Sequence, residues 1–349
     1  MERTGLARRI RERGLELGLG AIGFAPIGPS AQAAALRDWL GRGRHGTMTY
    51  MARTAEERMD VRRRFPWARS AVMAAVTYLP YRGGREAQEG VVRNVARYAV
   101  GRDYHRVLAD RLRALDAFIL AEAPGARTQV YTDTGPVLER ELAARAGLGW
   151  FGKNTNLIGP RGDSWTLLGE ILTDLDLPAG EPVADRCGTC TACLDACPTG
   201  AIPQPYVVDS TRCISYLTIE LKGSIPEPQR ADLENWVFGC DICQEVCPWN
   251  RKVAATGDPA FLPSDDLRRR SLADLVRITG EEFRATFGES PIERTRHRGL
   301  VRNALIVAAN TGDEEALAAA RERASDADPV IRETARWAVD RRRESGHDR

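Results

Sequence analysis

Apolar residues in the first half of the chain recur at helical spacing in some segments and form short, uninterrupted runs in others. The segments with helical character predict helices at residues 5–18, 31–43 and 103–122. The short runs bounded by turn-forming residues predict strands at residues 20–28, 70–79 and 127–133. This mixed order of elements indicates an α+β domain over residues 1–180.

One further helix is predicted over residues 137–149, with Pro136 near its first turn and Gly147 at its end. Residues 181–262 follow and are rich in cysteine, proline and turn-forming residues. Such a segment buries little apolar area of its own. We therefore predict a separate domain there that bound metal clusters hold together.

The last part of the chain, residues 263–349, is expected to be a helical tail. Residues 299–313 and 328–342 each place arginine and alanine at helical spacing along one face. The second segment resembles a helix of a HEAT repeat, with Asp328-Pro329 at its start and Arg332 within it. Two such units are few for a free-standing solenoid, so we expect them to pack on the rest of the protein. Two ordinary terminal helices are the alternative.

Composition and charge narrow the class of protein. The formal net charge is +2 over 349 residues, so any nucleic-acid site must come from local clustering of basic residues. The N-terminal segment is too charged for a secretory signal, and the apolar run at 70–79 is far shorter than a membrane span. We expect a cytoplasmic protein with no membrane association, whose cysteines bind metal.

The cysteines form two runs, C-x2-C-x2-C-x3-C-P from residue 187 and C-x2-C-x3-C-P from residue 240. In two-cluster ferredoxins, three closely spaced thiolates bind one 4Fe-4S cluster and the cysteine before proline ligates the other. Cluster one is then bound by Cys187, Cys190, Cys193 and Cys247. Cluster two receives Cys197, Cys240 and Cys243, and the one remaining cysteine, Cys213, is its predicted fourth ligand. A zinc ribbon, the alternative, would use two C-x2-C knuckles instead.

Two clusters form an electron relay but do not reduce a substrate by themselves. Residues 1–180 are therefore expected to hold a second redox centre. The motifs DACPTGAI, RCISYLT, GCDICQEVCPWN, GRDYH (101–105) and DTGPVLERELAARAGLGWFGKN (133–154) resemble those of epoxyqueuosine reductases. The resemblance extends over nearly the whole chain, and the last motif is the most specific.

The resemblance implies an oxidoreductase that converts epoxyqueuosine to queuosine at the wobble position of a tRNA anticodon, in queuosine biosynthesis. It implies cobalamin and two 4Fe-4S clusters as cofactors. The implied fold has a cobalamin-binding domain similar to reductive dehalogenases and nitroreductases, then a ferredoxin-like module and the HEAT-like tail. The implied partners are a tRNA with a GUN anticodon and an external single-electron donor of the flavodoxin or ferredoxin type. We expect a monomer.

The resemblance also implies that cobalamin binds with its own base displaced and without a protein histidine ligand. A D-x-H-x-x-G motif, which supplies such a histidine in other proteins, is absent, since Asp103-Tyr104-His105 is followed by Arg-Val-Leu. We expect His105 to be an ordinary helix residue rather than an acid or base.

Asp133 is the predicted proton donor to the oxygen that leaves when the epoxide opens. A helix N-terminus would lower the pKa of this carboxyl, whereas a donor needs a raised pKa. Burial against the corrin and the substrate would have to outweigh that effect. A helix-capping role is the alternative for Asp133.

The remaining candidate residues are basic or polar. The resemblance places cobalamin contacts at Arg58, Asp133, Lys153 and Asn154, with Ser215 and Lys222 as weaker candidates. A cluster of arginines without acids suits tRNA phosphates, at Arg294, Arg296, Arg298 and Arg302. Solvated surface residues are the alternative reading of both sets.

Two rival functions remain open at this point. A corrinoid reductive dehalogenase shares the two-cluster layout, although such proteins typically carry an export signal. A non-catalytic ferredoxin-type electron carrier would need neither Asp133 nor cobalamin. Corrin absorption bands in the reconstituted protein would separate a reductase from a carrier.

Overall fold

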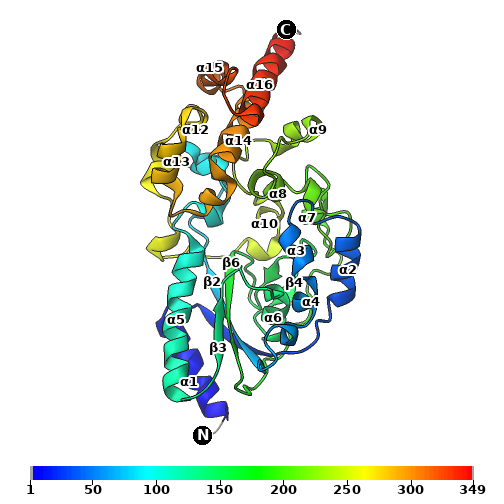
Figure 1. Cartoon of the computed structure of the whole chain (residues 1–349), viewed down its shortest axis with the longest axis vertical. Coiled ribbons are helices and arrows are strands. Elements are labelled where there is room, and N and C mark those ends of the chain that lie inside the picture. Colours follow the sequence, from blue (N-terminus) through cyan, green and yellow to red (C-terminus); the bar gives the residue numbers. More distant parts are fainter. Residues whose placement is uncertain (1–2, 348–349) are drawn as a thin grey trace.

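The computed structural model describes residues 3–347, which form an elongated molecule with the two ends of the chain at opposite poles (Figure 1). A half built around a sheet contains the N-terminus, and a helical tail contains the C-terminus. The cysteine-rich loops lie between them. The predicted mixture of helix and sheet is confirmed. Within the described range, every helix is too short or too polar to cross a membrane.

The sheet has four antiparallel strands in the order β1-β2-β6-β3. Three of them correspond to the predicted strands: β1 (Ala21–Pro26), β2 (Ser70–Thr77) and β3 (Thr128–Tyr131). The fourth, β6 (Thr166–Thr173), is not among the predicted strands, because Gly169 and Glu170 interrupt its apolar run. A separate short hairpin pairs β4 (Trp150–Phe151) with β5 (Leu157–Ile158).

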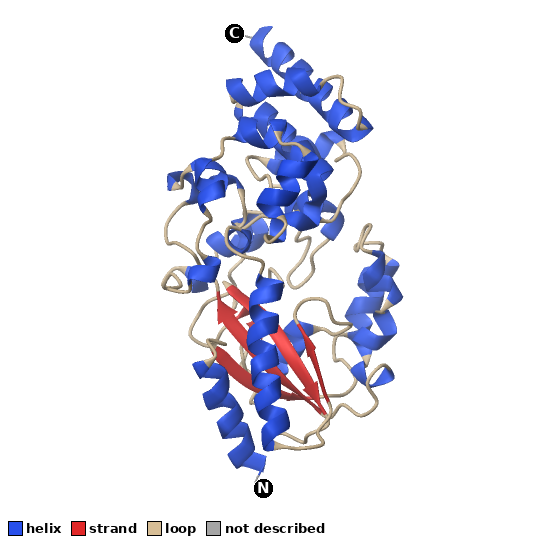
Figure 2. Ribbon diagram, turned by 60° about the vertical axis from the view of Figure 1, so that its left-hand side comes forward, coloured by secondary structure: helices blue, strands red, loops and turns tan. Residues whose placement is uncertain are grey.

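Helices cover both faces of the sheet. Two long helices, α1 (Arg3–Glu16) and α5 (Tyr104–Glu122), lie across one face, as Figure 2 shows. The apolar positions of α5 fall on one side of the helix because they are three or four residues apart, and they are buried. Short helices connect β1 to β2: α2 (Ala33–Gly41), α3 (Thr49–Arg53) and α4 (Ala55–Met59).

The other face carries α6 (Glu139–Arg145), which is shorter than the predicted helix over 137–149. Pro136 lies ahead of the helix rather than in its first turn. Gly147 follows the helix with a φ of 78°, a left-handed conformation that glycine adopts without strain, and so ends it as predicted. The residue that precedes the helix is Leu138, and no side chain caps it. Asp133 therefore does not cap α6.

The cysteine-rich segment consists of loops with short helical turns. They are α7 (Ala192–Asp195), α8 (Ile214–Ile219), α9 (Glu227–Arg230) and α10 (Ile242–Glu245). Each of the two cysteine runs contains one of these turns, α7 or α10. The conformation of such irregular loops depends mainly on the residues against which they pack.

The tail is helical, as predicted for residues 263–349, and its first helix begins at Asp265. Its helices are α11 (Asp265–Arg269), α12 (Leu272–Arg277), α13 (Gly280–Phe287), α14 (Arg296–Thr311), α15 (Glu314–Arg323) and α16 (Pro329–His347). The two segments predicted to be related form α14 and α16, which pack against each other. Their apolar core also takes in Val91, Val92 and Val95 from the segment between β2 and α5. The tail is thus joined to the rest of the protein through buried contacts.

Candidate functional site

A cleft of about 910 Å³ lies where the half built around the sheet meets the cysteine-rich loops. One side is lined by α3, α4, the start of α5 and the segment that follows β3, which contains Asp133. The opposite side is lined by cysteines, namely Cys197, Cys213, Cys240 and Cys243. The fold thus brings the predicted proton donor and the predicted ligands of cluster two to one shared space.

Asp133 is held by the first turn of α5. The hydroxyl of Tyr104 donates to Oδ2 of Asp133 at 2.8 Å, and Nε2 of His105 lies 3.4 Å from the same oxygen. The other ring nitrogen of His105, Nδ1, lies 2.7 Å from Oδ1 of Asp103, the residue that caps α5. The imidazole therefore bridges two carboxyl groups.

This bridge fixes the protonation of both partners. Burial opposes the charged form of His105, but its hydrogen bonds to Asp103 and Asp133 outweigh burial and raise its pKa to about 9. Desolvation raises the pKa of Asp133, but hydrogen bonds from His105 and Tyr104 prevail and leave that pKa below its ordinary value. The side chain of Asp133 is 48% exposed and lines the cleft.

Hydrogen bonds from His105 and Tyr104 outweigh burial by the protein and keep the pKa of Asp133 below its ordinary value, so these groups by themselves leave the carboxyl ionised and His105 protonated at neutral pH. The expectation that burial against a corrin and a substrate raises the pKa of Asp133 stays a prediction. The expectation that His105 is an ordinary helix residue is corrected, because both of its ring nitrogens contact carboxylates. The sequence carries a hint of this arrangement in the Asp-Tyr-His order at the start of α5, but the contact with Asp133 depends on the tertiary fold.

The backbone of Asp133 is also unusual. Its φ of 57° lies in the left-handed region, which costs energy for a residue other than glycine. Its backbone N–H donates to Oε1 of Glu139, the first residue of α6, at 2.6 Å. This bond stabilises the turn that presents the carboxylate to the cleft.

Burial and neighbouring thiols raise the pKa of several of the eight cysteines. Burial raises the pKa of the Cys193 thiol to about 11, and its nearest charged neighbours include Cys247, Cys187 and Cys190. Burial also raises the pKa of Cys243, whose neighbours include Cys213, Cys193 and Cys197, and Cys240 likewise lies near Cys213 and Cys243. Among the described side chains, no three or more His, Cys, Asp or Glu converge closely enough to hold a single metal ion. The two predicted ligand sets, of four cysteines each, stay a prediction.

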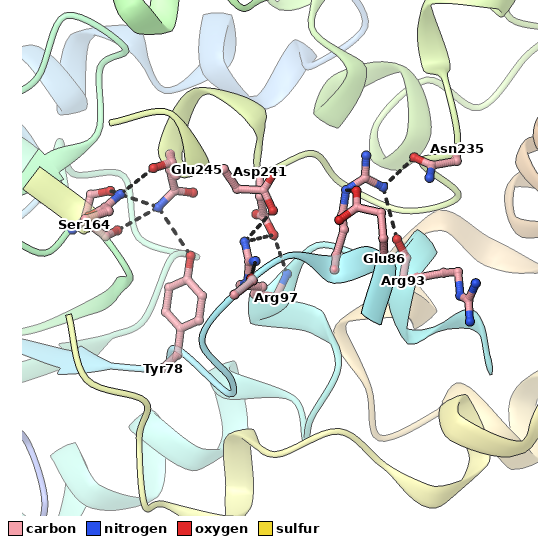
Figure 3. Close-up of polar contacts among 12 residues, drawn as sticks. Tyr78, Glu86, Arg93, Arg97, Ser164, Asn235, Asp241 and Glu245 are labelled. Atoms are coloured by element: carbon pink, nitrogen blue, oxygen red, sulfur yellow. Dashed lines mark hydrogen bonds and ion pairs between the residues drawn. The ribbon is translucent and has the colours of Figure 1, made fainter. Parts of the chain in front are cut away.

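Buried polar contacts fix the loop of the second cysteine run (Figure 3). Arg97 is buried and ion-paired with Glu245 at 2.6 Å, and its backbone N–H donates to Oδ2 of Asp241 at 2.8 Å. The side chain of Gln244, between these two acids, donates to the backbone carbonyl of Ser164 at 2.9 Å. The connection between β2 and α5 and the segment before β6 therefore position Cys240, Cys243 and Cys247.

The predicted cobalamin contacts separate into two sets. Arg58, Asn154 and Ser215 line the cleft. Arg58 is held by Thr54 and by the carbonyl of Val137, and the amide of Asn154 also donates to the carbonyl of Cys243 at 3.1 Å.

Two lysines have other partners. Lys153 donates to the carbonyls of Gly188 and Cys190 at 2.6 and 2.9 Å, so it supports the first cysteine loop. Lys222 donates to the carbonyls of Ile219 and Arg294 and supports the wall of the cleft. Neither lysine is among the described residues that line the cleft, and their role as direct cobalamin contacts stays a prediction.

The four arginines predicted to bind tRNA do not form one surface. Arg294 lines the cleft and is paired with Glu220 at 2.6 Å. Arg296 and Arg298 are exposed and paired with Glu293 and Asp328. Arg302 is fully buried, which makes its predicted phosphate contact wrong.

The guanidinium group of Arg302 has a structural role. It donates hydrogen bonds to the carbonyls of Leu217, Leu221 and Gly223 and to the side chain of Asn303. Burial, together with the charge of Arg230, lowers its pKa to about 10. Arg302 therefore joins α14 to the segment that follows Cys213.

Replacing Arg302 by methionine is expected to lower the free energy of unfolding by about 3 kcal/mol or more, because several buried carbonyls would lose their donor. The same substitution at Arg298, one turn earlier on α14, removes a partly exposed ion pair and is expected to cost less than about 1 kcal/mol. Denaturant unfolding of the iron-loaded proteins measures both. Equal stability of the two variants would contradict a structural role for Arg302.

The lining of the cleft is compatible with a corrinoid bound without a protein histidine. Among the described residues that line the cleft, His105 is the one histidine, and its two ring nitrogens contact the carboxyl groups of Asp103 and Asp133. Arg58 and Asn154 offer donors of the kind that suit amide and phosphate groups. The residues present therefore fit the group that the sequence motifs imply.

Two family models match the chain. One, described as a 4Fe-4S double cluster binding domain, matches residues 186–250. The other, described as Epoxyqueuosine reductase QueG, DUF1730, matches residues 58–134.

Curated relatives match over most of their length. The epoxyqueuosine reductase of Xanthomonas campestris pv. campestris is 41% identical over 341 residues, covering 96% of this chain and 96% of that protein. The epoxyqueuosine reductase of Escherichia coli K12 is 38% identical over 339 residues, covering 96% of this chain and 89% of that protein.

Solved structures agree in fold. A crystal structure of epoxyqueuosine reductase with an epoxyqueuosine-modified stem loop of tyrosine tRNA has a TM-score of 0.88 at 32% identity, covering 97% of this chain and 90% of that chain. A structure of the Bacillus subtilis enzyme, with a catalytic aspartate loop swung out of its active site, has a TM-score of 0.87 at 31% identity. It covers 97% of this chain and 90% of that chain.

Proposed function

Because the chain belongs to the epoxyqueuosine reductase family, we propose that it reduces epoxyqueuosine in tRNA to queuosine, as the relatives' names describe. The observation that carries this proposal is the single cleft that joins Asp133 to Cys197, Cys213, Cys240 and Cys243. A site that combines an acidic side chain with a route for electrons suits a reduction that also consumes protons.

The electrons would come from outside the protein and pass through two clusters. We assign cluster one to Cys187, Cys190, Cys193 and Cys247, and cluster two to Cys197, Cys213, Cys240 and Cys243. Cys190 is exposed, whereas the second group lines the cleft. A single-electron carrier of the flavodoxin or ferredoxin type would therefore deliver to the first cluster. The second cluster would supply the cleft.

Cobalamin, when bound in the cleft with its base displaced, would supply the strongly reducing centre that the chemistry needs. Arg58 and Asn154 would hold its polar periphery. Asp133 and His105 would hold the proton that the released oxygen requires, with the proton resident on His105 until it is used. Tyr104 orients Asp133 through its hydroxyl.

The substrate side of the proposal rests on charge and access. Arg294 enters the cleft, and Arg296 and Arg298 are exposed on the same helix-forming segment, where they suit phosphates of an anticodon stem loop. We propose a tRNA with a GUN anticodon as substrate, a monomer as the active form and the cytoplasm as the place of action. The tail containing α14 and α16 is proposed to be HEAT-like.

The deciding experiment uses anaerobically reconstituted protein, loaded with iron, sulfide and cobalamin, and tRNA isolated from a strain that accumulates epoxyqueuosine. Nucleoside mass spectrometry should show queuosine replacing epoxyqueuosine when a low-potential reductant is added. Unchanged epoxyqueuosine with fully loaded protein would overturn the function. Iron–sulfur absorption without corrin bands would favour a non-catalytic electron carrier instead.

A further inference from the structure

Behind Asp133 lies a second acidic group that the mechanism above does not use. Glu170, in the middle of β6, is fully buried, and neither of its carboxyl oxygens has a hydrogen-bond donor among the described residues. Its carboxyl interacts with that of Glu139, the half-buried first residue of α6, and α6 packs against β6. Two neighbouring carboxylates of which one is fully buried would repel each other strongly if both were ionised, so we expect a proton on the pair.

Glu139 connects this pair to the cleft. Its carboxyl accepts the backbone N–H of Asp133 at 2.6 Å, and the residue lines the cleft, whereas Glu170 lies behind it in the sheet. Burial and the charge of Asp133 raise the pKa of Glu139 to about 7. Burial and the neighbouring Glu139 raise the pKa of Glu170 well above its ordinary value. The geometry and the electrostatics therefore agree that the pair retains a proton at neutral pH.

Charged and titratable groups on the neighbouring elements set this balance. They are Asp133 after β3, Arg58 on α4, Arg140 on α6, and Tyr104 and His105 at the start of α5. With one proton on the glutamate pair, its remaining charge and those of Asp133 and Asp103 balance the charges of Arg58, Arg140 and protonated His105. Removing that proton would leave an uncompensated negative charge in the cleft wall, which burial disfavours.

The proposed reaction consumes two protons. Reduction of an epoxide to an alkene breaks both carbon–oxygen bonds, forms the carbon–carbon double bond and releases the oxygen as water. It requires two electrons, which a single-electron carrier protein would deliver one at a time through the clusters. The pair formed by His105 and Asp133 supplies one of these protons. The second proton needs another donor in the cleft.

We propose that the Glu139–Glu170 carboxyl pair stores this second proton and supplies it to the cleft through Glu139. The inference rests on the proposed function. Glu139 faces the substrate space and would be a catalytic residue. Glu170 acts through Glu139 and is a positioning residue that keeps the proton in place.

The test compares single-turnover reduction of epoxyqueuosine in a tRNA stem loop by the fully loaded protein at about pH 6 and about pH 8, on either side of the pKa of Glu139. For Glu170→Gln we expect a rate within about threefold of the unsubstituted protein at the lower pH and a fall of about tenfold or more at the higher pH. At the higher pH, Glu139 in this variant has no stored proton behind it. For Glu139→Gln we expect the rate to fall by about a hundredfold at both pH values.

Glu122→Gln is the matched control, because it removes a carboxylate from the far end of α5, where Glu122 pairs with Arg9. This variant should keep the rate and the pH dependence. A merely structural role for Glu170 would lower the rate equally at both pH values, and that outcome would overturn the proposal. Unchanged rates in Glu139→Gln would also overturn it.

Infrared difference spectroscopy provides a readout that needs neither substrate nor turnover. The protonated carboxyl band should be present in the unsubstituted protein at about pH 8 and missing in Glu170→Gln, since burial holds the pair's proton there. Absence of that band would overturn the proposal, whatever the activity. If the unsubstituted protein and Glu122→Gln both leave epoxyqueuosine unchanged, the proposed function fails, while the spectrum still decides whether the pair holds a proton.

Discussion

Replacing Asp133 by asparagine is expected to lower the rate of epoxyqueuosine reduction by about a hundredfold to ten-thousandfold, the usual contribution of a positioned general acid or base. The amide has nearly the same shape as the carboxyl, so it can keep the hydrogen bond from Tyr104. It cannot carry the negative charge that holds the proton on His105. The variant should therefore bind iron and cobalamin normally and fail at turnover.

The electrostatic part of this prediction has its own pH window. The folded-state pKa of His105 is raised to about 9, so the stability from its ion pairs is fully present below its unfolded value of 6.5 and is lost as pH rises through about 9. The pKa of Asp133 is lowered, so its contribution is present above its unfolded value of 3.8 and is lost as pH falls below that value. In the asparagine variant, the pKa of His105 should fall, although Asp103 still raises it.

Histidine NMR resolves this shift, and single-turnover assays measure the rate. Asp110→Asn is the control, because Asp110 lies on α5, is exposed and pairs with the exposed Arg113. Near-normal turnover of Asp133→Asn would remove the proton-donor role. An unchanged pKa of His105 would mean that the two side chains do not interact in solution.

The division of the cysteines is the part of the site that the sequence predicts best. Spacing within each run is local, and the proline after Cys197 and Cys247 marks the thiolate that crosses to the other cluster. Cys213 follows by elimination, because no other cysteine remains. The structure places it in the cleft wall beside Cys197 and Cys243, which requires contacts between segments that no sequence pattern records.

The acid groups around Asp133 were much harder to predict. Glu170 looks like an interruption of an apolar run, so the sequence hides both the strand β6 and its buried carboxyl. His105 meets Asp133 only because β3 ends beside the first turn of α5. Contacts between side chains on different elements depend on packing, which periodicity does not encode.

The arginines of the tail show the same limit on one helix. Arg298 and Arg302 are one turn apart on α14 and belong to the same arginine-rich motif, although apolar residues flank Arg302. Arg298 is exposed, but Arg302 is enclosed by the loop that follows α8, whose carbonyls it binds. Residue type and spacing predict a basic helix face. The packing of the neighbouring loop determines which arginine side chains of that face are exposed to solvent.

Replacing Cys213 by alanine is expected to lower the iron content of the reconstituted protein from about eight to about four atoms per chain, because one of two 4Fe-4S clusters loses a ligand. The first cluster should survive, since its four proposed ligands lie outside the cleft and Lys153 still supports their loop. Reduction of epoxyqueuosine should stop, because the lost cluster is the one proposed to face the substrate.

Thr211→Ala is the control for this prediction, since it alters the same loop, where Thr211 bonds Asp209, without removing a thiol. Iron analysis and electron paramagnetic resonance of the reduced proteins measure the two clusters separately. Full iron content in Cys213→Ala would show that this thiol is not a ligand, and the second cluster would then need a ligand from outside the eight cysteines. Loss of both clusters would instead mean that cluster two holds the first cysteine loop in place, through the turn between β4 and β5, where Asn154 contacts Cys243 and the adjacent Lys153 contacts the first loop.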